Sequence, residues 1–276
     1  MDQSDSGGPP GYLAAEEYTE IVEMLNRVST VILFAIARSS EATRDTIIRN
    51  FIARSAVCLD SILRLWAHGR YSDCWALHRL LVDRLFHLHA LEAKGDWQEF
   101  SDWTFIRQYE ANHRALSDEL MGAKARATIQ QPKPEVEARY QAVKARAPKW
   151  VRPRAEDVAK ELGMPFLYRF AYDYGSTQVH PMATDGEEEF LILTGFNPQG
   201  YGVDRRLLLS NSVLLHTMVL QQGLSASGLK WRTILFDFLG HVRAALGGDK
   251  EFRRSFAKIA SAGPDFQWCQ QSSLAG

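Results

Sequence analysis

Cysteine is scarce in this chain, and neither sign of charge dominates it. Only three cysteines, Cys58, Cys74 and Cys269, occur in 276 residues. They have neither the spacing of zinc ligands nor the density of a secreted disulfide scaffold. Lysine and arginine total 32 against 33 aspartate and glutamate residues, so no overall charge draws the chain to nucleic acid or to an acidic membrane. We therefore expect a cytoplasmic protein whose affinity for any polyanion is local.

The sequence also lacks a hydrophobic run long enough to cross a bilayer. Its longest apolar stretch, residues 28–37, is far shorter than the roughly 20 residues that a spanning helix needs. Residues 1–12 are acidic and rich in glycine and proline, which favours a disordered lead-in over a signal peptide. We expect no membrane segment, one helical domain over residues 13–262 and an irregular tail at 263–276.

Several signatures of enzyme sites are missing. The chain has no glycine-rich phosphate loop, no HExxH, no CxxC and no nucleophile elbow. His180 with Asp185, Glu187, Glu188 and Glu189 could hold a divalent cation, but an acidic loop is more often simply solvated. The sequence therefore predicts no metal and no cofactor.

Apolar residues recur at intervals of three and four along most of the chain, which predicts amphipathic helices. Short turns between the first of them favour antiparallel neighbours, so we expect an all-α, up-down helical bundle. Residues 190–194, FLILT, suggest a short strand or buried connector, which would allow one hairpin near 190–203. The expected helices cover residues 13–38, 41–68, 72–91, 97–120, 135–147, 205–225, 229–246 and 249–259.

The helix expected at residues 72–91 is apolar on nearly every side and still carries several charged and imidazole groups. A helix of this kind is buried, so its polar groups need partners. Arg79, Asp83 and His87 follow one another at i, i+4 and i+8, where neighbouring side chains can bond. This row is the best candidate for a catalytic site.

A second polar row occurs at Tyr172, Ser176 and His180, whose side chains would share one helix face. Pro181 places His180 at or near the end of the helix, where the dipole favours a protonated ring. We expect this helix to pack beside the central one. Arg79 would then hold a phosphate, and His180, with Ser176 or Tyr172 nearby, would move a proton.

Residues 121–160 are the basic connecting segment of the sequence, with ten lysine or arginine residues against four acids. Prolines frame a short helix at residues 135–147. Basic side chains interleaved with aromatic ones can bind phosphates and stack on bases, although a solvated connector remains an open alternative. The candidates for nucleic-acid binding are Lys144, Arg146, Lys149, Trp150, Arg152 and Arg154.

The Arg79-x-x-x-Asp83 pair and the Tyr172-x-x-x-Ser176-x-x-x-His180 element together resemble an uncharacterised family of bacterial all-helical proteins, classified as a domain of unknown function. The resemblance covers roughly residues 45–225. It implies a helical fold with these residues at its site. Members of that family usually carry glutamate where this chain has Asp83, so the acid here has a shorter reach.

More distantly, the chain resembles the HEPN superfamily of helical bundles. In that superfamily an arginine and a histidine four to six residues later form a metal-independent ribonuclease site, generally across a dimer. Arg84 and His89 have this spacing, but five residues turn a helix by about 140°, so their side chains diverge. The resemblance implies an RNA-acting protein in a toxin or antiphage role, with a homodimer as its assembly.

Two other interpretations of the polar rows stay open. They could form a satisfied network that fixes helix register in a non-catalytic module, which binds a protein partner through other surfaces. Alternatively, Ser176, His180 and Asp83 could form a hydrolase triad, although no oxyanion hole is recognisable. A nuclease needs Arg79 and His180 in one solvent-open cleft, whereas a structural network needs them sealed from water.

Overall fold

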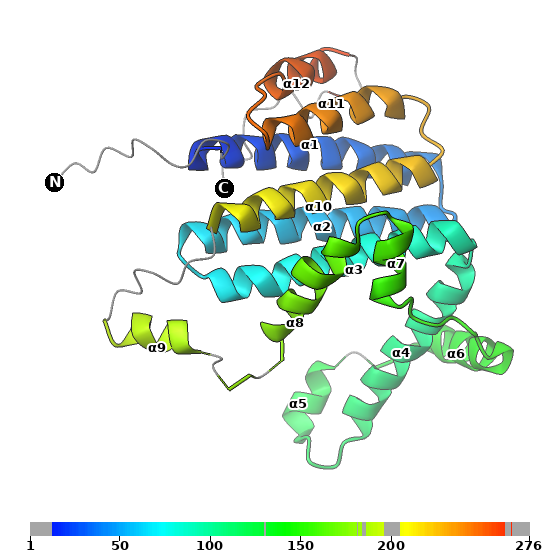
Figure 1. Cartoon of the computed structure of the whole chain (residues 1–276). Helices are drawn as coiled ribbons and strands as arrows, with labels where there is room; N and C mark the ends of the chain where they lie inside the picture. Colours follow the sequence, from blue (N-terminus) through cyan, green and yellow to red (C-terminus); the bar gives the residue numbers. More distant parts are fainter. Residues whose placement is uncertain are drawn as a thin grey trace.

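The computed structural model describes residues 13–129, 131–180, 182–183, 186–195, 205–262 and 266. Within these residues every regular element is a helix and no strand occurs (Figure 1). The prediction of an all-α fold is therefore confirmed. The expected lead-in at 1–12 and all of the expected tail except residue 266 lie outside the described residues.

Four long helices build the core: α1 (Ala15–Ser39), α2 (Thr43–Ala67), α3 (Tyr71–Lys94) and α10 (Arg205–Ala226). The first three run alternately in opposite directions, and α10 runs alongside them (Figure 1). The pairs α1 with α2 and α2 with α3 pack together, and α10 packs on all three helices. Branched aliphatic side chains fill the space between them, including the fully buried Ile21, Leu25, Ile32, Ile48, Ile52, Leu59, Ile62 and Leu81.

Two buried histidines tie α10 to its neighbours. His78 Nδ1 on α3 lies 2.9 Å from Ser212 Oγ on α10, and His216 Nε2 on α10 lies 3.2 Å from Ser29 Oγ on α1. Each serine hydroxyl donates its hydrogen to a carbonyl one turn earlier, over 2.7 Å, so each imidazole must be the donor to its serine. Burial lowers the pKa of both histidines to about 3, which keeps them neutral.

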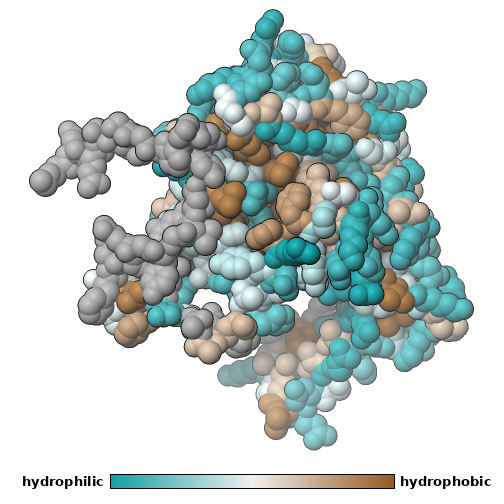
Figure 2. Space-filling model, viewed as in Figure 1, coloured by the Kyte–Doolittle hydropathy of each residue, from teal (hydrophilic) through white to brown (hydrophobic). Residues whose placement is uncertain are grey.

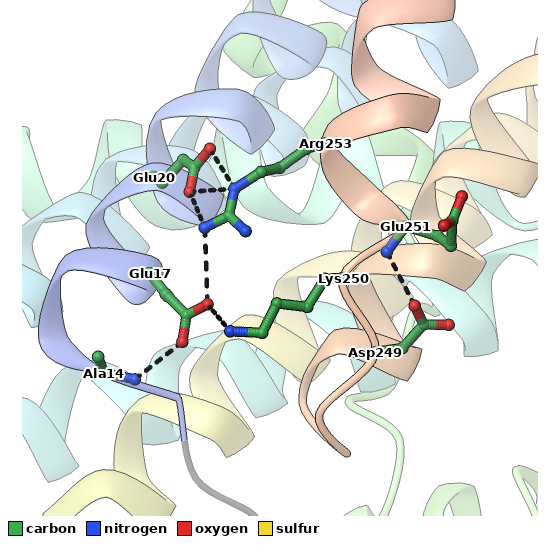
Figure 3. A network of polar contacts seen from close by, with 7 residues as sticks. All are labelled: Ala14, Glu17, Glu20, Asp249, Lys250, Glu251 and Arg253. Carbon is green, nitrogen blue, oxygen red and sulfur yellow. Dashed lines mark hydrogen bonds and ion pairs between the residues drawn. The ribbon is translucent and has the colours of Figure 1, made fainter.

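The last two helices, α11 (Arg232–Ala245) and α12 (Phe252–Ala260), pack against each other and cover α1 and α10. Charged side chains fasten the start of α12 to the first turns of α1 (Figure 3). Arg253 pairs with Glu20 at 2.6 Å, and Lys250 Nζ lies 2.7 Å from Glu17 Oε1. The C-terminal helices are thus held to the opposite end of the chain.

An arm of shorter helices leaves the bundle after α3: α4 (Trp97–Ser117), α5 (Ala123–Thr128) and α6 (Pro134–Arg146) (Figure 1). The chain then returns through α7 (Ala155–Glu161), which packs on α3. The sequence predicted α4 and α6 but not α5 or α7. Helices of six or seven residues present too few turns for a hydrophobic period to be visible.

The strand expected at 190–194 is wrong. Glu187–Leu193 form α9, and a short apolar run cannot by its pattern alone be distinguished from a helix. The acidic residues at its start favour a helix because they lie beside the positive end of the helix dipole. Residues 196–204, the rest of the expected hairpin, lie outside the described residues.

The surface is mixed on the face shown in Figure 2, where hydrophobic side chains gather near the middle, over α10, and hydrophilic ones cover most of the periphery. In the described part of the chain, no helix combines the length and the apolar character that a membrane span requires.

Candidate functional site

The row of polar side chains predicted on α3 is present. Arg79 Nη1 forms an ion pair with Asp83 Oδ2, and His87 Nδ1 lies 2.7 Å from the backbone carbonyl oxygen of Asp83. A carbonyl oxygen can only accept, so Nδ1 of His87 carries the hydrogen. In the neutral ring, Nε2 is then the basic atom.

The second polar row lies directly on α3. It begins in a π-helix, η1 (Leu167–Asp173), which continues into the short α8 (Tyr174–Thr177). Gly175 makes this approach possible, because a Cβ atom there would lie 3.0 Å from Cβ of Arg79 and 3.5 Å from the Trp75 carbonyl oxygen. Single π-turns of this kind are frequent at functional sites.

Arg79 is held on several sides by this second row. Its Nε donates to Ser176 Oγ over 3.0 Å, and its guanidinium carbon lies 3.3 Å from the centroid of the Tyr172 ring. The Ser176 hydroxyl in turn donates to the Tyr172 carbonyl over 2.7 Å. Together with Asp83, these residues form one cluster, which we call the Arg79 network. The side chains of Arg79 and Asp83 are only 12% and 22% exposed.

His180 lies outside the Arg79 network. The helix ends at Thr177, and among the described residues no hydrogen bond or ion pair involves the exposed His180 side chain. The expected composite site therefore brings Arg79, Ser176 and Tyr172 together without His180. A hydrolase triad is not assembled either, since the Ser176 hydroxyl points its hydrogen at a carbonyl.

His87 lies in an aromatic and cationic environment. Its ring stacks on Trp150, with centroids 5.8 Å apart, and lies 6.2 Å from Phe100. Burial is the main influence on the His87 pKa and lowers it; the charges of Arg152 and Arg79 lower it further, while the carbonyl bond and carboxylate of Asp83 act in the opposite direction. The imidazole is therefore neutral at pH 7.

Trp150 does not lie where a base could stack on it. Its side chain is 7% exposed, and its ring centroid lies 4.8 Å from that of Phe100 and 4.7 Å from that of Trp103. Together with His87, these rings cover the indole. We interpret Trp150 as the residue that anchors the loop after α6 to α3 and α4.

Several of the basic candidates already have partners. Arg146 pairs with the buried Asp102 at 2.7 Å, Lys144 Nζ donates to the Tyr140 hydroxyl over 2.8 Å, and Arg154 lies 3.6 Å from an aspartate of α7. The Arg152 side chain has no ion pair among the described residues, and its charge acts on His87. Of the basic candidates, it is therefore the one that extends the polar row of α3.

A cavity of about 490 Å³ opens at the end of α3, with Trp150 in its wall. Three cationic and two anionic side chains line it, so it is a polar pocket rather than an apolar one. Its lining residues are Lys94, Asp96, Glu99, Arg146, Ala147, Lys149, Trp150 and Val151.

The arginine and histidine with HEPN-like spacing do diverge. Arg84 Nη1 donates to the Leu80 carbonyl over 2.8 Å, whereas His89 Nε2 lies 3.7 Å from Glu161 on α7. The two side chains therefore point to different neighbours, as expected for residues five apart in a regular helix. Among the described residues, no group of three or more side chains could hold a metal ion. Asp185, one of the acids considered as a cation ligand, lies outside the described residues.

Comparison with known proteins gives one result. A model described as a family of unknown function (DUF5677) matches residues 45–193, just over half of the chain. This segment runs from α2 to α9 and contains both polar rows, in agreement with the expected resemblance to an uncharacterised family. No curated protein and no solved structure matches the chain significantly.

Proposed function

The chain belongs to this family of unknown function, and from the site itself we propose that it acts on RNA without a metal ion, at the row formed by Arg79, Asp83 and His87. The observation that carries the proposal is the hydrogen bonding and the neutral protonation state of the His87 imidazole. One ring nitrogen is fixed as a donor to a carbonyl, the ring is neutral, and two guanidinium groups act on it. A neutral imidazole beside cationic side chains is the combination that phosphodiester chemistry uses.

The proposed reaction is a transesterification within RNA. His87 Nε2 takes the proton of a ribose 2′-hydroxyl while that oxygen forms a bond to the adjacent phosphorus. The bond from phosphorus to the 5′-oxygen breaks, and the leaving oxygen takes a proton from the imidazolium. Arg79 and Arg152 stabilise the added negative charge on the phosphate. The products are a 2′,3′-cyclic phosphate and a free 5′-hydroxyl.

Basic side chains continue from this row toward the cavity at the end of α3. Arg79 and Lys94 lie on the same helix, about 22 Å apart at 1.5 Å per residue. Lys149 and Arg146 line the cavity beside Lys94. This length suits a single strand of several nucleotides, held mainly through its phosphates because Trp150 is covered. The overall charge of the chain is balanced, so the affinity would come from this surface alone.

A second candidate function is a non-catalytic module that binds a protein partner. The burial of Arg79 favours it, because Arg79 pairs with Asp83 and contacts Tyr172 and Ser176, which joins α3 to η1 and α8. A network of this kind can serve helix register alone. The physiological setting of the proposed RNA activity would be a toxin or antiphage role.

RNA binding tests the first candidate. We expect the purified chain to bind a labelled single-stranded RNA with an affinity that falls steeply as salt rises. Arg152→Glu should weaken binding at least about tenfold, because it reverses a charge next to His87. Lys258→Glu on the exposed side of α12 is the matched control and should change little. Equal affinities for both variants would favour the protein-binding module.

A further inference from the structure

Three aromatic side chains project from the outer side of the segment that carries η1 and α8. Phe166, Phe170 and Tyr174 are 47%, 69% and 41% exposed. They follow one another every four residues and form one stripe, which we call the aromatic ridge. The opposite side of the same segment is buried against the bundle through Leu167 and Ala171. Large exposed aromatic groups in a row are characteristic of a docking surface.

The ridge is held rigidly from behind. Ser176 bonds to Arg79, and Gly175 lies directly on α3. The Tyr174 ring meets the edge of Trp75 on α3, with centroids 4.9 Å apart. A partner that binds the ridge would therefore pay little entropy for ordering it.

The charges beside the ridge identify the partner. Arg169 and Asp173 are exposed and form no ion pair among the described residues. Counted along the π-helix, both lie on the same flank of Phe170, four residues apart and with opposite signs. In a dimer whose two-fold axis is perpendicular to this helix, the flank of one copy faces the same flank of the other copy, and the order of the residues is reversed. Arg169 of each copy then faces Asp173 of the other.

The aromatic groups match in the same arrangement. Around an axis level with Phe170, Phe170 of one copy meets Phe170 of the other, and Phe166 meets Tyr174. Arg169 of each copy then lies about 3 Å along the helix from Asp173 of the other, within reach of its long side chain. Six partly exposed aromatic side chains would bury about 600 Å² together, taking roughly 200 Å² for each fully exposed one. A stable interface buries about 1,200 Å² or more in total, so the flanking residues would supply the rest.

We propose that a second copy of this chain docks antiparallel on the aromatic ridge, with Arg169 and Asp173 paired across the two-fold axis. The interface is isologous, as in most homodimers. It does not depend on the proposed RNA activity. The RNA-facing row of α3 and the ridge lie on different sides of the η1 and α8 segment, so each can be altered separately.

Sedimentation velocity over a range of concentrations tests this dimer. Wild type should be dimeric, and Phe170→Glu should be monomeric. Leu120→Glu, at a residue 96% exposed on the distant arm, should remain dimeric. A monomeric wild type at every concentration, or a Phe170→Glu variant as dimeric as wild type, would overturn the proposal.

Charge reversal tests the antiparallel arrangement and does not alter the ridge itself. Arg169→Asp and Asp173→Arg should each weaken dimerisation at least about tenfold, because each places like charges together at two symmetric positions. The double variant should restore the dimer, since it exchanges the two charges. Single variants without effect, or a double variant that is not restored, would contradict the pairing even if a dimer forms.

Discussion

Arg79 Nε on α3 donates to Ser176 Oγ on α8 over 3.0 Å, across 97 residues of sequence. This bond joins the central helix of the bundle to the segment that carries both the second polar row and the aromatic ridge. It uses one donor of the guanidinium, and the ion pair with Asp83 uses another. No hydrogen bond from Nη2 is present among the described residues, and in the proposed function this atom would donate to a phosphate.

Removing the guanidinium should destabilise the fold. Arg79→Met breaks the bond to Ser176 and leaves the Asp83 carboxylate, which is 22% exposed, without its ion pair. We expect the free energy of unfolding to fall by about 2 to 4 kcal/mol. Urea denaturation measures this loss. A double-mutant cycle with Asp83→Asn should give a coupling of about 1 kcal/mol or more, and a coupling near zero would show that the pair contributes nothing.

A methyl group at Gly175 should separate α8 from α3. Its Cβ would lie 3.0 Å from Cβ of Arg79, and neither helix can move without losing contacts, so Gly175→Ala should cost about 1 to 3 kcal/mol. Gly240→Ala in α11 is the control, because nothing lies within 4 Å of its Cβ position. The control should gain up to about 1 kcal/mol from helix propensity. Equal effects of the two substitutions would contradict the close packing.

The two buried histidines should make the fold sensitive to mild acid. Their pKa is about 3 in the folded chain against an ordinary value of 6.5, so below pH 6.5 the unfolded chain binds protons that the folded chain does not. Stability is therefore fully present above pH 6.5 and falls as the pH drops toward 3. Each histidine should contribute about 1.4 kcal/mol per pH unit to this fall.

Replacing one histidine should remove its share of that slope. His78→Asn keeps a donor near the Nδ1 position for Ser212 and cannot be protonated. The slope of unfolding free energy between pH 6 and pH 4.5 should be lower in this variant by about 1.4 kcal/mol per unit. Urea melts at several pH values measure it. An unchanged slope would mean that His78 is protonated in the folded chain.

Much of this arrangement follows from sequence periodicity. The i, i+4, i+8 spacing of Arg79, Asp83 and His87 predicted one row, and the structure shows it, because a regular helix brings such residues together. The association of Arg79 with Ser176 and Tyr172 was also expected. The role of these residues in catalysis remains a prediction.

Other features depend on information that periodicity does not contain. The row that ends at His180 was expected to continue for two turns, but the helix stops at Thr177 after a π-turn that changes the angle between residues. Trp150 is covered because α3 and α4 supply rings from distant parts of the sequence. The apolar stretch before Thr194 is helical, which an apolar run of this length does not distinguish from a strand by its pattern.

Cleavage of RNA in the presence of EDTA tests the central claim most directly. Wild type should convert a labelled single-stranded RNA to products with 2′,3′-cyclic phosphate ends. His87→Asn, which keeps a donor for the Asp83 carbonyl but lacks Nε2, should lower the rate about 100-fold or more. His113→Asn on α4, where the imidazole is exposed, should cleave like wild type. No cleavage by wild type, or a loss of activity in His180→Ala but not in His87→Asn, would contradict the assignment of the α3 row.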